Sequence, residues 1–174
     1  MRLLSLFFLT LTSLSAVNYD YIIAEPLLQE RMKKEFPIEH KTMFLTFHVS
    51  NPRLHLDGNK QRLDFTGDLK IPNIQDTQGK ALSAVVNVTS RIAYTKGGKL
   101  YLRQIKVVDI KSKFISEEMK SMLYSTMDQL LNEYFKVRPV YSLEKEKGVI
   151  GAAVQSIENV VIVKEGVKII FNVG

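Results

Sequence analysis

Hydrophobic and polar residues alternate along much of the middle of the chain. Alternation of this kind places every second side chain on the same face of a β-strand. The pattern recurs in successive segments, at residues 42–49, 53–71, 81–94 and 100–110. Within the second segment Asp57-Gly58 predicts a hairpin turn, and Gly67 is a candidate β-bulge. We therefore expect an antiparallel meander with one apolar face.

A long stretch with helical periodicity follows the meander. Placed about 100° apart, as in an α-helix, its apolar residues cover roughly 220° of the circumference, more than the stripe of a helix that lies on one surface. The apolar set is Met119, Met122, Leu123, Tyr124, Met127, Leu130, Leu131, Tyr134 and Phe135. The polar set is Ser121, Ser125, Asp128, Gln129, Asn132, Glu133 and Lys136. Ser116 predicts an N-cap, the acidic Glu117 and Glu118 suit the positive helix end, and Pro139 ends the helix.

Shorter elements are expected on both sides of this core pattern. Residues 19–24 favour a strand, and residues 25–36 favour a helix with Pro26 in its first turn. Residues 148–157 are compatible with a short helix, and residues 160–173 predict a strand pair around Glu165-Gly166.

These elements predict an α+β fold in one domain, residues 17–174. A flat sheet would cover only part of the wide apolar arc, whereas a strongly twisted sheet can cover more of it. We therefore expect a curved antiparallel sheet wrapped around the long amphipathic helix, with a short helix near the N-terminus.

The first residues have the composition of a signal peptide. Met1 and Arg2 precede an apolar run from Leu3 to Leu14, and small residues follow up to Ala16. We expect residues 1–16 to be removed and the mature protein to reside in the periplasm; a retained N-terminal anchor is the alternative. The run is too short for a bilayer core, which needs about 20 apolar residues. The chain also lacks cysteine, so it carries no disulfide or thiol chemistry.

The net charge and the spacing of the lysines indicate which kinds of partner the protein could bind. The formal net charge is +6, and the lysines are scattered along the chain. This favours weak attraction to anionic surfaces such as lipid headgroups over a nucleic-acid footprint. A solvated basic surface without a partner explains the charge equally well, and the oligomeric state does not follow from the sequence.

No motif indicates catalysis, a cofactor or a metal site. The histidines are His40, His48 and His55, and their spacing does not match a metal-ligand pattern. His48 shares a strand face with Thr46 and Phe44, which favours a position on the solvent side. We therefore expect a protein that is not an enzyme and that needs neither cofactor nor metal.

The apolar arc of the long helix is the remaining candidate for function. Met119, Met122 and Met127 lie within it, and methionine side chains adapt to irregular space and varied partners. On the residues alone, ordinary core packing explains them more simply than a ligand cavity does.

Three pieces of sequence resemble a known family: "LYLRQIKVVDIKSKF", "MDQLLNEYFKVRPVYSL" and "VVIVKEGVKIIFNV". They are similar to the YceB-like family of small bacterial envelope lipoproteins, which itself resembles a single unit of the tubular lipid-binding (TULIP) superfamily. The resemblance implies a curved sheet around a long helix, and binding of a lipid or similar amphiphile without a reaction. Family members carry a lipobox cysteine after the signal sequence, and this chain has none, so a soluble periplasmic form is expected.

With the resemblance, we predict a hydrophobic ligand tunnel between the helix and the sheet. The predicted lining consists of Met119, Met122, Leu123, Met127, Leu130, Leu131, Phe65 and Val86. The alternative is a fully packed cell-envelope interaction or scaffold protein without a small ligand.

Overall fold

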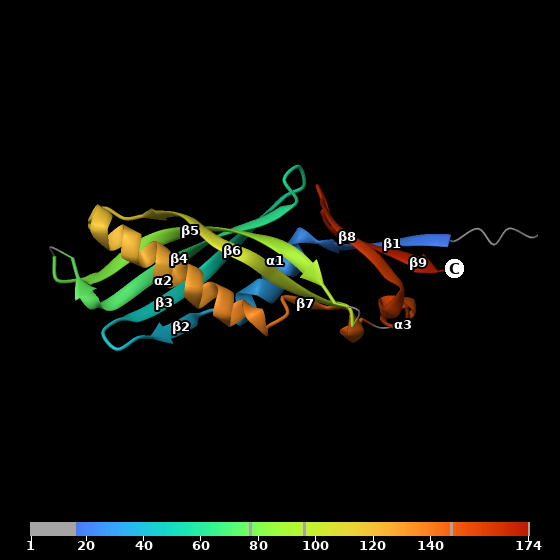
Figure 1. Cartoon of the computed structure of the whole chain (residues 1–174), viewed down its shortest axis with the longest axis horizontal. Helices are drawn as coiled ribbons and strands as arrows, with labels where there is room; N and C mark the ends of the chain where they lie inside the picture. Colours follow the sequence, from blue (N-terminus) through green and yellow to red (C-terminus); the bar gives the residue numbers. More distant parts are fainter. Residues whose placement is uncertain (1–16, 77, 96, 147, 174) are drawn as a thin grey trace, which may run out of the picture.

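The computed structural model describes residues 17–76, 78–95, 97–146 and 148–173. The predicted signal peptide, residues 1–16, lies outside the described residues. Within them, the strands form a six-stranded sheet, in the order β2-β3-β4-β5-β6-β7, and a three-stranded sheet, in the order β1-β9-β8. Figure 1 shows the larger sheet with α2 along it, and the smaller sheet at one end of the molecule.

The larger sheet is the predicted meander. Its paired strands are antiparallel, and they form a curved but open sheet. The strands are β2 (Ile38–Lys41), β3 (Thr46–Asp57), β4 (Arg62–Gln75), β5 (Ala81–Tyr94), β6 (Lys99–Lys111) and the short β7 (Tyr141–Ser142). Alternate residues of β4 and β5 are buried on one face, as the alternation of the sequence predicted. The α+β class and the antiparallel meander are therefore confirmed.

The predicted bulge at Gly67 is wrong. Gly67 pairs in regular register with Val86, and the irregularity lies opposite it in β3, between Ser50 and Arg53. There Asn51 adopts a φ of 51°, a conformation that asparagine tolerates better than most residues. A Cβ at Gly67 would lie 3.0 Å from Cγ1 of Val49. A side chain at Gly67 would therefore fit only if Val49 moved by a few tenths of an ångström.

The strand predicted to start at residue 42 starts later. Thr42–Leu45 form the loop between β2 and β3, and β3 begins at Thr46. Thr42 closes this loop: its backbone N–H donates to Leu45 O at 2.8 Å, and its hydroxyl accepts from Leu45 N at 3.0 Å. β2 itself was not predicted, because only Ile38 of its four residues is buried and no alternation marks it.

The long helix α2 spans Glu117–Lys136 and begins at the predicted cap. The Ser116 hydroxyl accepts a hydrogen bond from Met119 N at 3.3 Å. The backbone N–H of Glu118 and the Ser116 hydroxyl hold the pKa of the Glu118 carboxyl below its ordinary value. The acidic first turn is therefore explained by capping, as the sequence indicated.

Polar side chains of α2 cover the free edge of β6 beyond β7. Asn132 donates to Ile105 O at 2.7 Å and accepts from Ile105 N at 3.3 Å. Asp128 accepts a hydrogen bond from Val107 N. These contacts join α2 to the sheet edge on its polar side while its apolar side faces the core.

The first helix, α1 (Glu25–Glu35), covers the free edge of β3 in the same way. Gln29 accepts from Leu54 N at 2.7 Å and donates to Pro52 O at 2.8 Å. The Tyr134 hydroxyl of α2 donates to Glu35 O at 2.7 Å. The two helices therefore close opposite edges of the larger sheet and meet at the end of α1.

The predicted strand pair near the C-terminus is confirmed, and it belongs to the smaller sheet. β8 (Ile157–Val163) and β9 (Gly166–Val173) are antiparallel, and β1 (Val17–Ala24) pairs with β9 along its full length. Gln61, in the turn between β3 and β4, accepts from Ile162 N and donates to Ile162 O, both at 2.8 Å. The predicted short helix before β8 is α3 (Val149–Ala153), continued by a 3₁₀ turn at Val154–Ser156.

None of the helices among the described residues combines the length and the apolar character that crossing a membrane requires.

Candidate functional site

The predicted lining residues converge between α2 and the larger sheet. Leu123, Met127 and Leu131 are completely buried, at 0% exposure, and Leu130 is nearly so. Phe65 of β4 and Val86 of β5 are buried in the same hydrophobic cluster. The structure thus brings six of the eight predicted residues into one apolar core.

The other two predicted residues lie at the start of α2, where this core reaches the surface. Met119 is partly buried and packs against the core. Met122 is 44% exposed. The apolar surface of α2 therefore continues from the buried residues to the solvent at the N-terminal end of the helix.

The core between α2 and the sheet is closed around its central residues. A side chain with 0% exposure borders no space large enough for a water molecule, so no open space adjoins Leu123, Met127 or Leu131. At the C-terminal end of α2, the ring of Phe135 packs 6.2 Å from that of Phe36. An acyl chain would have to move α2 relative to the sheet in order to enter.

The chemistry of this core is almost entirely apolar. Among the described residues, Ser90 is the one polar residue that is buried as deeply as the apolar core. Its hydroxyl donates to Leu63 O at 2.9 Å. The core therefore offers apolar contact area, at about 25 cal/mol per Å² buried, and no free polar group that would orient a ligand.

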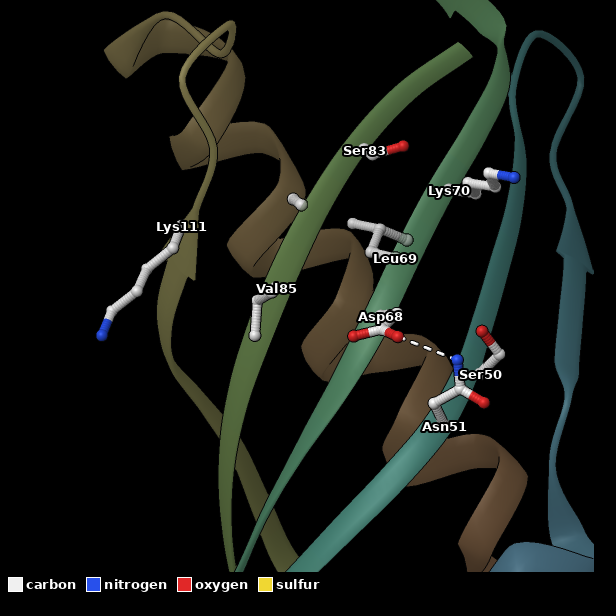
Figure 2. Close-up of a pocket in the computed structure, with 9 residues that line it drawn as sticks. Ser50, Asn51, Asp68, Leu69, Lys70, Ser83, Val85 and Lys111 are labelled. Atoms are coloured by element: carbon white, nitrogen blue, oxygen red, sulfur yellow. Dashed lines mark hydrogen bonds between the residues drawn. The ribbon is translucent and has the colours of Figure 1, made fainter.

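A separate hollow lies on the outer face of the sheet, away from α2 (Figure 2). Its volume is ≈ 450 Å³, and Asp68 lies within it. The Asn51 amide donates to Asp68 at 2.9 Å, and Arg53 lies 3.3 Å from the same carboxylate. These contacts, the amide first, hold the pKa of Asp68 below its ordinary value. The carboxylate is therefore already partnered, and the hollow is open to solvent.

A second outer-face hollow, of ≈ 430 Å³, holds residues that sequence reasoning did not single out. His55, Asp64 and Thr89 are directly opposite one another across β3, β4 and β5. Arg62 donates to Asp64 Oδ2 at 3.0 Å, whereas Asp64 Oδ1 and the Thr89 hydroxyl have no partner among the described residues. No pattern in the sequence could have found this row, because such polar positions also occur on any solvated sheet face.

The described part of the chain contains no group of three acidic or histidine side chains placed to hold a metal ion. His48 of β3 lies on the solvent face of the sheet, opposite Glu39 of β2, and its side chain is partly exposed with Nδ1 3.6 Å from the Glu39 carboxylate. The position expected for it is therefore confirmed.

A family model described as "Protein of unknown function (DUF1439)" matches residues 23–166, which is most of the chain. No curated protein sequence matches the chain significantly.

Proposed function

The chain belongs to this family of unknown function, and we propose that it binds a lipid or similar amphiphile without catalysing a reaction. In this proposal the protein acts in the periplasm as a single TULIP-like unit, with the curved sheet wrapped around α2. The observation that supports it most is the continuous apolar surface of α2, which runs from the buried Met127 to the exposed Met122.

Entry of an acyl chain begins, in this proposal, at the N-terminal end of α2. Met119 and Met122 move aside there, because methionine side chains change shape at low cost. The helix then shifts away from Phe65 and Val86 to admit the chain. Asp128 and Asn132 bond β6 further along the helix. In this proposal α2 pivots about these two contacts.

A second candidate function follows from the close packing of the same core. The complete burial of Leu123, Met127 and Leu131 is what a packed scaffold requires. In that case the protein holds an envelope partner through its surface and binds no small ligand.

Uptake of a fluorescent fatty acid separates the two functions. Met122→Trp places a bulky ring at the proposed entrance, on a side chain already 44% exposed, so the free energy of unfolding should change by no more than about 0.5 kcal/mol. We expect uptake by this variant to be several-fold slower than by the wild type. Val137→Trp, at the opposite end of α2 on a side chain that is 72% exposed, is the matched control and should leave uptake unchanged.

Equal uptake by both variants would contradict entry at this end of the helix. No uptake by the wild-type protein would favour the packed scaffold.

A further inference from the structure

The most exposed large hydrophobic side chains of the described structure are adjacent, in the loop between β2 and β3. Met43 is 88% exposed and Phe44 is 80% exposed. The loop contains none of the glycine, asparagine, aspartate or proline residues that dominate turns. Neither the turn nor the core therefore accounts for a methionine and a phenylalanine at these positions.

Hydrogen bonds close the backbone of the loop that carries these two side chains. Its ends are joined by the hydrogen bond from Thr42 N to Leu45 O, and the Thr42 hydroxyl bonds Leu45 a second time. Beyond it, Lys41 and Thr46 pair as the last residues of β2 and the first of β3. Met43 and Phe44 are thus presented outward by a closed turn.

Lysines without a carboxylate partner lie in connections at the same end of the molecule as this loop. Lys41 ends β2, Lys80 precedes β5, and Lys113 lies between β6 and α2; all three are exposed. Among the described residues, none of the three has a carboxylate within ion-pair distance. Figure 1 shows these connections together at the end opposite β1 and β9.

Some acidic groups at this end pair with lysines, others bind backbone N–H groups, and Glu39 of β2 lies 3.6 Å from His48. Asp109 pairs with Lys111 at 3.6 Å, and Glu117 pairs with Lys120 at 2.6 Å. Asp76 accepts from the backbone N–H groups of Gln78 and Lys80, at 2.8 and 2.9 Å, and the Glu118 carboxylate binds the start of α2. Among the described residues, Lys41, Lys80 and Lys113 are therefore lysines at this end that have no carboxylate partner, while Glu39, Asp76 and Glu118 keep their negative charge.

We propose that this end of the molecule docks on an anionic lipid bilayer. Met43 and Phe44 enter the apolar layer, and Lys41, Lys80 and Lys113 contact lipid phosphates. Protruding apolar side chains with exposed lysines at the same end of the molecule match the layered chemistry of a membrane surface, where headgroup charge lies outside the hydrocarbon. The docking uses loop residues outside the core, so it does not require that the protein take up a ligand.

Tryptophan fluorescence gives a direct test, since the chain contains no tryptophan. The protein is purified as cells produce it. It carries the substitution Phe44→Trp, which supplies its only tryptophan. Vesicles of phosphatidylglycerol and phosphatidylcholine in equal parts should shift its emission to the blue, and vesicles of phosphatidylcholine alone should shift it far less. Val137→Trp, exposed at the far end of α2, is the matched reporter and should not shift.

Vesicle flotation measures the two contributions separately. Phe44→Ser should weaken binding about tenfold, equivalent to ~1.4 kcal/mol. Neutralising Lys41, Lys80 and Lys113 with glutamine should weaken it about fivefold for each lysine, and it should reduce the dependence on salt. Lys164→Gln, in the exposed turn between β8 and β9, is the charge control and should bind as the wild type does.

Three outcomes would overturn the proposal. One is an equal response of the Phe44 and Val137 reporters. A second is equal binding to neutral and anionic vesicles. The third is a dimer that Phe44→Ser dissociates while vesicle binding stays unchanged, which would identify a second copy as the occupant. Loss of fatty-acid uptake with intact vesicle binding would contradict only the function proposed above.

Discussion

Three side-chain amides in the described part of the chain pair with strand backbones as a neighbouring strand would. Gln29 binds the edge of β3, Gln61 binds β8, and Asn132 binds β6, each as both donor and acceptor. Open strand edges expose unpaired N–H and C=O groups and promote aggregation. These amides therefore close strand edges that the two sheets leave free.

Asn132→Ala removes one of these pairings. Ile105 N and O would then lose their partner next to a buried side chain, and an unsatisfied backbone group costs about 1–3 kcal/mol. We expect a loss of this size in the free energy of unfolding, measured by urea denaturation. The control is Gln129→Ala on the exposed side of α2, where the amide bonds only Glu133 and the change should stay within about 0.5 kcal/mol. Equal losses in the two variants would show that the edge contact contributes nothing.

The Asp57 carboxylate, in the turn between β3 and β4, makes the stability of the fold depend on pH. Its carboxylate accepts from Lys60 N at 3.1 Å, and this bond, with the charges of Lys60 and Arg62, holds its pKa below the ordinary value. Because the folded pKa is the lower one, the stabilisation is present above the ordinary aspartate pKa of about 3.9 and is lost as the pH falls through the folded value. Asp57→Asn should therefore show a shallower loss of stability than the wild type as the pH falls below about 4.

Thermal melts across this pH range check the prediction, with Glu165→Gln in the exposed turn between β8 and β9 as the control. Identical acid dependence of the Asp57→Asn variant and the wild type would contradict the role given to this carboxylate.

At the scale of elements, α2 combines a buried apolar side with a polar side that bonds β6. Met127 is completely buried, so Met127→Trp should overfill the core and lower the free energy of unfolding by about 1–3 kcal/mol. Leu130→Ala should create a cavity and cost about 2–5 kcal/mol. Denaturant melts of the ligand-free protein measure both. Near-zero losses in both variants would mean that unfilled space adjoins the helix.

The sequence predicted most elements because their burial follows a simple period. β4, β5 and α2 bury alternate or helically spaced residues, which can be read directly. The loop at Met43 and Phe44 was assigned to a strand because Met43 and Leu45 extend the alternation of β3 to residues before its start. The bulge near Asn51 was missed because a register shift depends on the neighbouring strand as well as on local residues.

At the scale of the whole molecule, pairings between distant segments could not be predicted. β1 pairs with β9 from the other end of the chain, and Gln61 binds β8; no local pattern encodes either contact. Burial of the helix residues predicted as a site could be anticipated from the apolar arc. The close packing around these residues could not be anticipated, since it depends on how side chains from several strands fill the same space.

The two ends of the molecule differ in character. One end carries the smaller sheet, and the other carries the exposed Met43 and Phe44, the unpaired lysines and the start of α2. In the proposed function, the apolar entrance beside Met122 thus lies at the same end as the proposed membrane contact. This arrangement would place the entrance near a source of lipid.

Native mass spectrometry of the protein purified without detergent tests most directly whether α2 and the sheet hold an acyl chain. We predict a bound species with the mass of a lipid or fatty acid, released when the protein is denatured. Adding fatty acid to stripped protein should restore a bound species at one molecule per chain. A ligand-free mass throughout, with no uptake of added fatty acid, would contradict the proposed function.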